Sequence, residues 1–518
     1  MDNITIHRKK DGRAYAYSYE SYWDKEKKAS RNKQVCLGRY NEETGEITPS
    51  REYRKKSKTR TNAMGFSATT KVYGPYLLLS KLTDRIGLSR ILMECLPDIY
   101  EEILSIVFFV VQKGLALSRC EMWSESHRHP ADRPISSQQV SDILRRVPED
   151  SRQHFLSLWL EHLLENELLC YDITSISSYA TANEYVRWGH NRDNEKLPQI
   201  NLAMLYGQKS GLPAYYRRLQ GNITDVATLE TTIDTLDFLG KRRLYLVLDR
   251  GFYSEDNIDL LFAKRYRFIL MARADRVWVR EIIDQYYEHI ASPERYRQTG
   301  DNEVLYMVSH LFQWKGRRCY AHLYYNATRA AEDFDNLNRE LVICKRELEL
   351  GKQSNYANKS LCDRFLIVKT TPKRGLTVSY NDAEIQKYRK RYAGFFCILT
   401  NVKTDSGELL DIYRRKDVVE NCFDDLKNGL DMKRLRIHSS EAMDTRLFIQ
   451  FLALILISKI RSELKGDEEL KFKSPRQIME ALEPIVKITC SDKSWSIYSE
   501  TGPMQQRIVN LFDIATDS

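Results

Sequence analysis

Residues 413–427 read YRRKDVVENCFDDLK. The composition predicts a helix on which Tyr413, Lys416 and Glu420 stand at positions i, i+3 and i+7, with Lys427 at i+14. All four side chains would therefore share one helix face. A carboxylate between cations on such a face can hold a divalent cation beside phosphodiester oxygens. The same pattern also fits a solvated helix with i,i+4 ion pairs, so its interpretation depends on the sequence upstream.

Two apolar runs upstream each end in an aspartate. Leu168–Tyr171 leads to Asp172, and Leu244–Leu248 leads to Asp249. Short apolar runs bounded by turn residues are typical of buried strands. A single aspartate at a strand end is more often a turn former or a helix cap. The order Asp, Asp and then Glu on a basic helix is more specific, because carboxylates from two strands and one helix can converge on a pair of Mg²⁺ ions.

With these residues the chain resembles the DDE transposases of bacterial insertion sequences, and Asp172, Asp249 and Glu420 match their acidic triad. Three further blocks agree with the family, at residues 197–229, 248–261 and 394–401. The resemblance covers roughly residues 165–460.

More narrowly, the segment opened by Tyr413 is similar to the Y-x2-R-x3-E-x6-K signature of the insertion-sequence-4 superfamily. It departs from that signature at Lys416, where the family usually has arginine. Lysine keeps the charge but loses the bidentate fork to phosphate. Arg414 and Arg415 are adjacent, although neither is in register.

The resemblance implies an α/β fold with a ribonuclease-H-like catalytic core that is interrupted by a β-rich insertion. A small N-terminal β unit and a helical domain would precede this core, and both are candidates for DNA binding. The expected domains are a basic β-rich unit at 1–65, a helical domain at 66–165, the core at 166–275, the insertion at 276–393, the second part of the core with the Glu420 helix at 394–465, and a C-terminal extension at 466–518.

Composition is compatible with a nucleic-acid partner. The 518 residues include 80 Lys and Arg against 71 Asp and Glu, which gives a formal charge of +9. The basic run Arg51–Arg60 fits either a DNA-end-binding module or a solvated linker. The ten cysteines form no pattern typical of a zinc site.

No export signal or membrane span is expected. The N-terminus lacks an apolar core of the kind found in signal peptides. The apolar runs Ile103–Val111 and Leu447–Ile457 are too short to cross a bilayer and are predicted to be buried core helices. A further helix is expected after Ser136, which is a suitable cap. The expected location is the cytoplasm of a bacterium, associated with the nucleoid.

The resemblance implies that Asp172, Asp249 and Glu420 are both the catalytic residues and the ligands of two Mg²⁺ ions, which Mn²⁺ can replace. Thr174 and Arg250 are predicted to support the two aspartates. The residues expected to bind DNA are Tyr413, Arg415, Lys416, Lys427, Lys433, Arg434, Arg436 and His438.

The expected function is that of a DNA transposase, which cleaves transposon ends and transfers the freed strand into target DNA. Its partners would be double-stranded DNA, as terminal inverted repeats and as target, and a second copy of the chain in the synaptic complex. Two alternatives stay open: a structure-selective DNA nuclease on the same core, and a non-catalytic DNA-binding protein derived from a transposase. The latter would be expected to have lost a triad carboxylate, and all three are present.

Overall fold

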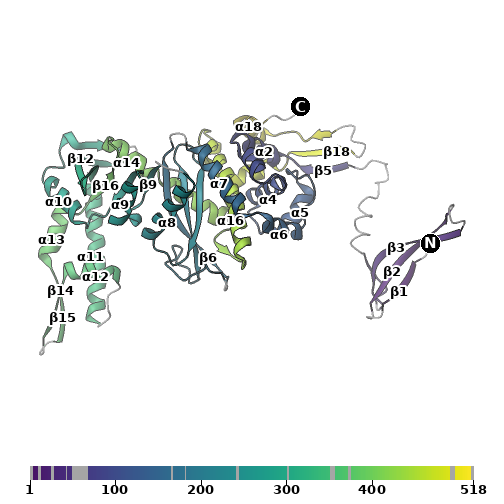
Figure 1. The fold of residues 1–518 in the computed structure, drawn as a ribbon, viewed down its shortest axis with the longest axis horizontal. Coiled ribbons are helices and arrows are strands. Elements are labelled where there is room, and N and C mark those ends of the chain that lie inside the picture. Colours follow the sequence, from purple (N-terminus) through teal and green to yellow (C-terminus); the bar gives the residue numbers. More distant parts are fainter. Residues whose placement is uncertain are drawn as a thin grey trace. The chain divides into compact units, whose positions relative to one another are not determined.

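The computed structural model describes residues 4–9, 13–24, 29–42, 44–49, 68–164, 167–180, 183–240, 244–299, 303–350, 356–371, 375–490 and 496–514. Met1–Lys71 with Val486–Ser499 forms one compact unit, and Val72–Ile485 with Glu500–Ser518 forms another. Figure 1 shows the elements of both.

The smaller unit is built from strands. Four of them form an antiparallel sheet in the order β1-β2-β3-β4. Gly38 in this sheet allows a close approach, because a Cβ at that position would meet the carbonyl oxygen of Thr48 at 2.0 Å. The run Arg51–Arg60 lies outside the described residues. The four strands are β1 (Ile4–Arg8), β2 (Ala14–Asp24), β3 (Ala29–Tyr40) and β4 (Ile47–Pro49), and a second sheet contains β5 (Ala68–Val72), β18 (Val486–Cys490) and β19 (Ser496–Tyr498).

The larger unit is organised around a ten-stranded mixed sheet in the order β11-β12-β13-β16-β10-β9-β6-β7-β8, with β17 paired to β6. β6 is parallel to β9, and β9 to β10, whereas β7 is antiparallel to β6. The two predicted aspartate-bearing strands are β6 and β9. The strands are β6 (Leu169–Ser178), β7 (Gln199–Gly207), β8 (Pro213–Gln220), β9 (Tyr245–Leu248), β10 (Arg267–Ala272), β11 (Tyr296–Gln298), β12 (Val304–Trp314), β13 (Arg317–Tyr325), β16 (Phe395–Thr400) and β17 (Arg434–Leu435).

A layer of helices packs around the long helix α16 (Ser440–Leu464), which is apolar on nearly all sides and is buried. α16 contacts α2 (Gly74–Arg85), α4 (Tyr100–Lys113) and α6 (Ser137–Arg146) as well as β8. The remaining members of this layer are α3 (Leu88–Cys95), α5 (Cys120–Ser126), α7 (Glu149–Leu163), α17 (Pro475–Leu482) and α18 (Pro503–Phe512).

Several sequence predictions for this layer are confirmed. The runs Ile103–Val111 and Leu447–Ile457 lie in α4 and α16 and are buried. Ser136 caps α6 and forms a capping box with Gln139. Among the described helices, no single one is long and apolar enough to cross a membrane, although α4 and the segment Leu117–Ser126 pass that test together as a bent pair, by length and composition only.

One continuous hydrophobic core joins these helices to the central sheet. The expected boundary at residue 165 therefore does not separate two cores. α17 also contacts α2 and α4, so part of the expected C-terminal extension completes the helical layer. The reason is that α16, which follows the catalytic segment in sequence, packs between the helices and the sheet.

The prediction of a separate β-rich insertion at 276–393 is wrong in its architecture. β11, β12 and β13 join the central sheet, because β13 pairs with β16 from Tyr320 to Tyr325. Most of the remainder is helical and has a small hydrophobic core of its own, which includes Leu341 and Phe365. Figure 1 shows this part, made of α11 (Ala327–Glu349), α12 (Tyr356–Phe365), β14 (Leu366–Thr371), β15 (Gly375–Tyr380) and α13 (Asp382–Arg391).

Candidate active site

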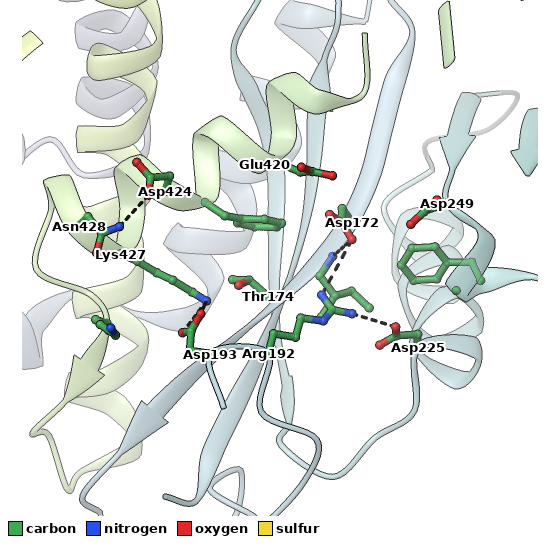
Figure 2. Close-up of a pocket in the computed structure, with 15 residues that line it drawn as sticks. Asp172, Thr174, Arg192, Asp193, Asp225, Asp249, Glu420, Asp424, Lys427 and Asn428 are labelled. Atoms are coloured by element: carbon green, nitrogen blue, oxygen red, sulfur yellow. Dashed lines mark hydrogen bonds and ion pairs between the residues drawn. The ribbon is translucent and has the colours of Figure 1, made fainter. Parts of the chain in front are cut away.

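The three predicted carboxylates line one cavity of about 640 Å³. Asp172 lies on β6, Asp249 follows β9 directly, and Glu420 lies on α15 (Asp417–Asp424). Figure 2 shows the three side chains around this cavity. β6 and β9 are adjacent parallel strands, and after β6 the chain continues to β7, which pairs with the opposite edge of β6. In open α/β sheets, ligands bind at such a change in strand order, and the cavity lies there.

One edge of β6 has no partner strand beside the cavity among the strands that the structure describes. β9 pairs with β6 only from Leu169 to Tyr171, and β17 pairs with the same edge only at Ser177 and Ser178. Within the described strands, none pairs with that edge between Asp172 and Ser177. Residues of one strand that are two apart project to the same face, so Asp172 and Thr174 point the same way, and both line the cavity.

Asp172 is the most enclosed of the three carboxylates. Its Oδ1 accepts a hydrogen bond of 2.7 Å from the backbone N–H of Ile173 and lies 3.9 Å from Nη1 of Arg192. Burial raises the pKa of Asp172 to about 6, because these contacts only partly compensate for the lost hydration. A carboxyl with a raised pKa in a cavity is typical of a functional site.

Asp249 is held by the last turn of α14 (Ser406–Arg414) and by the turn that follows this helix. The hydroxyl of Tyr413 donates a hydrogen bond of 2.6 Å to Asp249, and Nζ of Lys416 lies 3.8 Å from the same oxygen. Burial alone would raise the pKa of this carboxyl, but the hydrogen bond and the cation outweigh burial and hold the pKa below its ordinary value. Tyr413 is therefore buried behind Asp249 rather than exposed toward DNA.

The prediction that Tyr413–Lys427 forms one helix with a common functional face is wrong. α14 ends at Arg414, a turn at 415–416 follows, α15 ends at Asp424, and a π-helix spans Asp425–Gly429. In the turn, the N–H of Lys416 bonds to the carbonyl of Tyr413 with the tighter i→i+3 spacing. This turn and the π-helix change the angular step between residues, so a constant 3.6-residue period does not hold.

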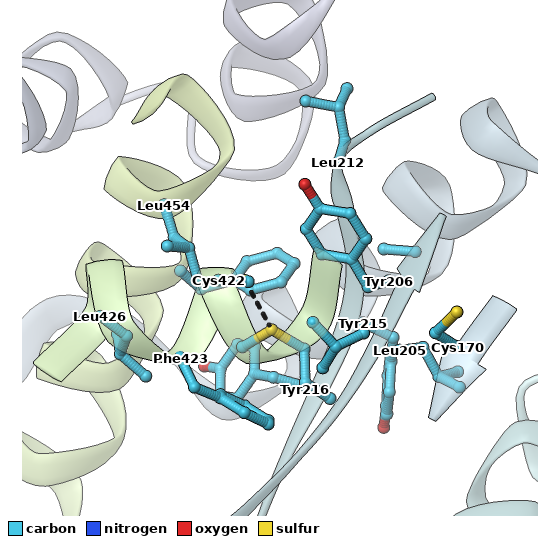
Figure 3. Packing of buried hydrophobic residues seen from close by; sticks show 14 of the residues in the cluster. Cys170, Leu205, Tyr206, Leu212, Tyr215, Tyr216, Cys422, Phe423, Leu426 and Leu454 are labelled. Atoms are coloured by element: carbon cyan, nitrogen blue, oxygen red, sulfur yellow. Dashed lines mark hydrogen bonds between the residues drawn. The ribbon is translucent and has the colours of Figure 1, made fainter. Parts of the chain in front are cut away.

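The residues of this segment therefore do not share one face, and each has its own position relative to the cavity. Lys416 lies in the turn, 3.4 Å from Glu420 and 3.8 Å from Asp249, and links two of the three carboxylates. The side chain of Glu420 is 63% exposed. The opposite side of α15 is buried, and Figure 3 shows Cys422 facing β7, where its sulfur lies 3.4 Å from that of Met204.

The loop between β6 and β7 carries site residues that the sequence analysis missed. Asp193 forms an ion pair with Lys427 at 2.7 Å, and both side chains are mostly buried. Arg192 pairs with Asp225 at 2.8 Å and approaches Asp172. All of them line the cavity (Figure 2). The feature of the sequence that could have revealed them is the cluster of charged residues in this loop. Such a cluster by itself is typical of a solvated turn.

The other predicted site residues divide into two groups. Arg434 pairs with Glu195 at 2.8 Å and Lys433 approaches the same carboxylate at 4.0 Å, so the basic cluster after Glu420 is partly neutralised by the same loop. Lys433 and the buried Thr174 line the catalytic cavity. The members that do not line it are exposed, and they are Arg250, Arg415, Arg434, Arg436 and His438.

The three carboxylates are chemically suited to bind a divalent cation. Three carboxylates supply the hard oxygen ligands that Mg²⁺ and Mn²⁺ prefer, and they line one cavity. Among the described residues, no group of three His, Cys, Asp or Glu side chains is arranged so that it could hold a metal ion. Glu420 is the exposed member, so its rotamer can change without repacking of the core.

The comparisons with known proteins identify the family of this chain. Residues 164–456, more than half of the chain, match the family model of the transposase DDE domain, and the chain belongs to this family. It is therefore a transposase of the DDE class, whose members generally use divalent metal ions. No curated protein matches the sequence.

One solved structure with a detectable likeness is a cryo-electron-microscopy structure of a piggyBac transposase synaptic complex with hairpin DNA. It shares 11% sequence identity, covers 78% of this chain and 70% of that chain, and has a TM-score of 0.33. That score is too low to support an argument about detailed structure.

Proposed function

We propose that this protein is an active DNA transposase that cleaves at transposon ends and transfers the freed strand into target DNA. The observation that carries the proposal is the placement of Asp172, Asp249 and Glu420 around one cavity although they are far apart in sequence. All three carboxylates are present, which argues against a protein that has kept only DNA binding.

We also propose the finer assignments that the resemblance implied. The strands β8, β7, β6, β9 and β10, with α8 (Asp225–Phe238), α9 (Glu255–Ala263) and α15, would form the ribonuclease-H-like core. The insertion-sequence-4 subgroup is supported by Tyr413, Glu420 and Lys427, of which Tyr413 contacts a catalytic carboxylate directly.

In the proposed mechanism Asp172, Asp249 and Glu420 would hold two Mg²⁺ ions, whose chemistry when bound would be to activate the attacking oxygen and to stabilise the leaving one. Tyr413 keeps Asp249 ionised and oriented through its hydrogen bond. Lys416 lies between two carboxylates, where its charge can also stabilise the phosphate in the transition state. Lys427 must exchange Asp193 for a DNA phosphate before it can position the substrate.

The remaining residues that are predicted to contact DNA lie on the exposed side of this site. Thr174 lines the cavity beside Asp172 and Arg250 follows Asp249, and both would support the aspartates rather than contact DNA. The basic side chains of Arg415, Lys433, Arg434, Arg436 and His438 would contact the DNA backbone. Since transposition joins two ends, the proposed active form is a homodimer on DNA.

The test is Glu420→Gln in the full-length protein, with Glu441→Gln on α16 as an exposed control that removes the same charge. The substrate is DNA carrying the sequences that flank the gene. Glu420→Gln is expected to abolish Mg²⁺-dependent cleavage and leave end binding nearly intact, while Glu441→Gln cleaves normally. Cleavage that persists in Glu420→Gln would overturn the site assignment.

A second assay separates the transposase from a nuclease on the same core. A pre-nicked end, with its 3′-hydroxyl already free, is supplied with Mg²⁺ and a target plasmid. A transposase joins the end to the plasmid, and Glu420→Gln does not. Cleavage of intact ends without any joining of pre-nicked ends would favour the nuclease.

A further inference from the structure

A second cavity, of about 860 Å³, adjoins the catalytic one and shares Asp249 and Gly251 with it. Five arginines from separate elements line it, at positions 250, 273, 280, 329 and 364. Its walls also include the aromatic rings of Tyr253, Tyr388 and Tyr392. The proposed mechanism leaves this cavity unused.

Two of the arginines are already neutralised by acids of the same cavity. Arg273 lies 3.0 Å from Asp275, and Arg329 lies 3.8 Å from Asp333. Glu340 is a further acid of the lining. These contacts leave fewer arginines of the cavity free to attract an anionic ligand.

Arg280, on α10 (Val277–Tyr286), differs from these arginines. Within the described part of the chain, no carboxylate lies within ion-pair distance of it. Its guanidinium lies 5.7 Å from the ring centroid of Tyr392, and the guanidinium of Arg364 lies 5.7 Å from the same centroid. Arg364 has an acidic partner outside the cavity lining, Glu384 at 3.3 Å.

The two cations disfavour each other. Burial and the charge of Arg364 lower the pKa of Arg280, and nearby acids offset this only in part. An anion between the two guanidinium groups would remove the repulsion and would accept their directed hydrogen bonds. Planar arginine forks suit the oxygens of a phosphate in particular.

We infer that Arg280 and Arg364, which both lie near the ring of Tyr392, form a phosphate-binding site for the DNA strand that leaves the catalytic cavity past Asp249. The inference rests on the proposed function, because it assigns the strand on which the catalytic carboxylates act. A strand with its scissile phosphate beside Asp249 passes directly into the second cavity, since the two cavities share that wall. Such a contact positions DNA without reading its sequence.

The test measures binding of a fluorescent end oligonucleotide in EDTA over a series of salt concentrations, with Arg280→Gln, Arg280→Lys and Arg346→Gln. Arg346 is an exposed arginine on α11 that does not line the cavity. Loss of one phosphate contact lowers the slope of log K against log salt by about 0.7–0.9. Arg280→Gln is expected to show that decrease, whereas Arg280→Lys and Arg346→Gln keep the wild-type slope.

Thermal unfolding of each variant separates this role from a structural one. An Arg280→Gln protein that melts earlier but keeps the wild-type slope would overturn the inference. A scan of single methylphosphonates along the oligonucleotide gives a second measurement. One neutralised phosphate next to the cleavage position is expected to weaken binding of the wild type and not of Arg280→Gln.

The outcomes distinguish the inference from the function on which it rests. Unchanged slopes with normal Glu420-dependent cleavage would overturn only the phosphate site. Cleavage that persists in Glu420→Gln would overturn the catalytic assignment and leave the slope result intact, and absence of any DNA binding would overturn both. Stabilisation by inorganic phosphate that requires Arg280, without a change in DNA slope, would assign the site to free phosphate and overturn the DNA contact.

Discussion

At the scale of single residues, Lys427 is a predicted DNA contact that is already paired within the protein. It was expected to contact DNA, yet both oxygens of Asp193 accept hydrogen bonds from its Nζ, at 2.7 and 2.9 Å. The Lys427 side chain is only 11% exposed, so the pair is shielded from water and from salt. If Lys427 has its proposed role, DNA and Asp193 would compete for the same cation.

Replacing Asp193 with asparagine tests this competition. Asp193→Asn is expected to bind DNA several-fold more tightly, with a salt slope larger by up to about 0.9, because Lys427 becomes available to a phosphate. The free protein should lose about 1–3 kcal/mol of unfolding free energy, because a mostly buried charge loses its partner. Fluorescence anisotropy and urea unfolding measure the two effects.

The matched control is Asp142→Asn, which removes a carboxylate from an exposed ion pair with Arg145 on α6. It should change neither DNA affinity nor stability appreciably. If Asp193→Asn binds DNA no better than wild type, Lys427 does not exchange partners and its proposed role is wrong.

At the scale of elements, the start of α14 is fixed by the central sheet. Nδ1 of His322, on β13, lies 2.8 Å from Oγ of Ser406, and the hydroxyl of Tyr324 donates to the carbonyl oxygen of Ser406 at 2.8 Å. The strands that were expected in a separate insertion thus hold the helix that leads to Tyr413.

Acid should weaken this connection. Burial lowers the pKa of His322 to about 4, from an ordinary value of 6.5, so the folded state favours the neutral imidazole. The stability that this provides is complete above pH 6.5 and is lost as the pH falls toward 4, because the unfolded state then binds the extra proton. The loss amounts to at most about 3 kcal/mol.

Urea midpoints at pH 7.5 and pH 5 measure this loss in the wild type, in His322→Asn and in His154→Asn. His154 is an exposed histidine of α7 and serves as the control. The fall in midpoint between the two pH values should be smaller in His322→Asn and unchanged in His154→Asn. An equal fall in all three proteins would contradict the assignment to His322.

At the scale of the whole molecule, the described part of the larger unit contains two hydrophobic cores of unequal size. The main core joins the helical layer to the sheet through α16, and the small core lies within α11, α12, α13 and the β14–β15 hairpin. Because the small core buries few side chains, it should open on its own without unfolding of the sheet.

Two substitutions to alanine, one in each core, compare the stability of the two cores. Phe448 is fully buried on α16, and Leu341 is 1% exposed on α11. Phe448→Ala should cost about 3–5 kcal/mol and raise hydrogen exchange in both α4 and the central sheet. Leu341→Ala should cost about 2–5 kcal/mol and raise exchange only within residues 327–391. Exchange that spreads to the central sheet in Leu341→Ala would show that the two cores unfold together.

The sequence by itself determined the three carboxylates and the class of protein. Asp172 and Asp249 could be found because each ends or follows an apolar run, and Glu420 because cations surround it in one short segment. These signals are local. The α/β fold class was also predicted, whereas the mixed pairing of the central sheet and the membership of β11, β12 and β13 in it were not. Strand pairing depends on partners distant in sequence, and the alternation within one strand does not identify them.

Only the tertiary structure decided which cations are available and what supports each carboxylate. Tyr413 reaches Asp249 across 164 positions of sequence, and Lys427 reaches Asp193 across 234. The strength of an ion pair depends on the distance and burial of its two groups, and neither quantity is local to a segment. For the same reason the arginines of the second cavity, which come from separate elements, showed no pattern in the sequence.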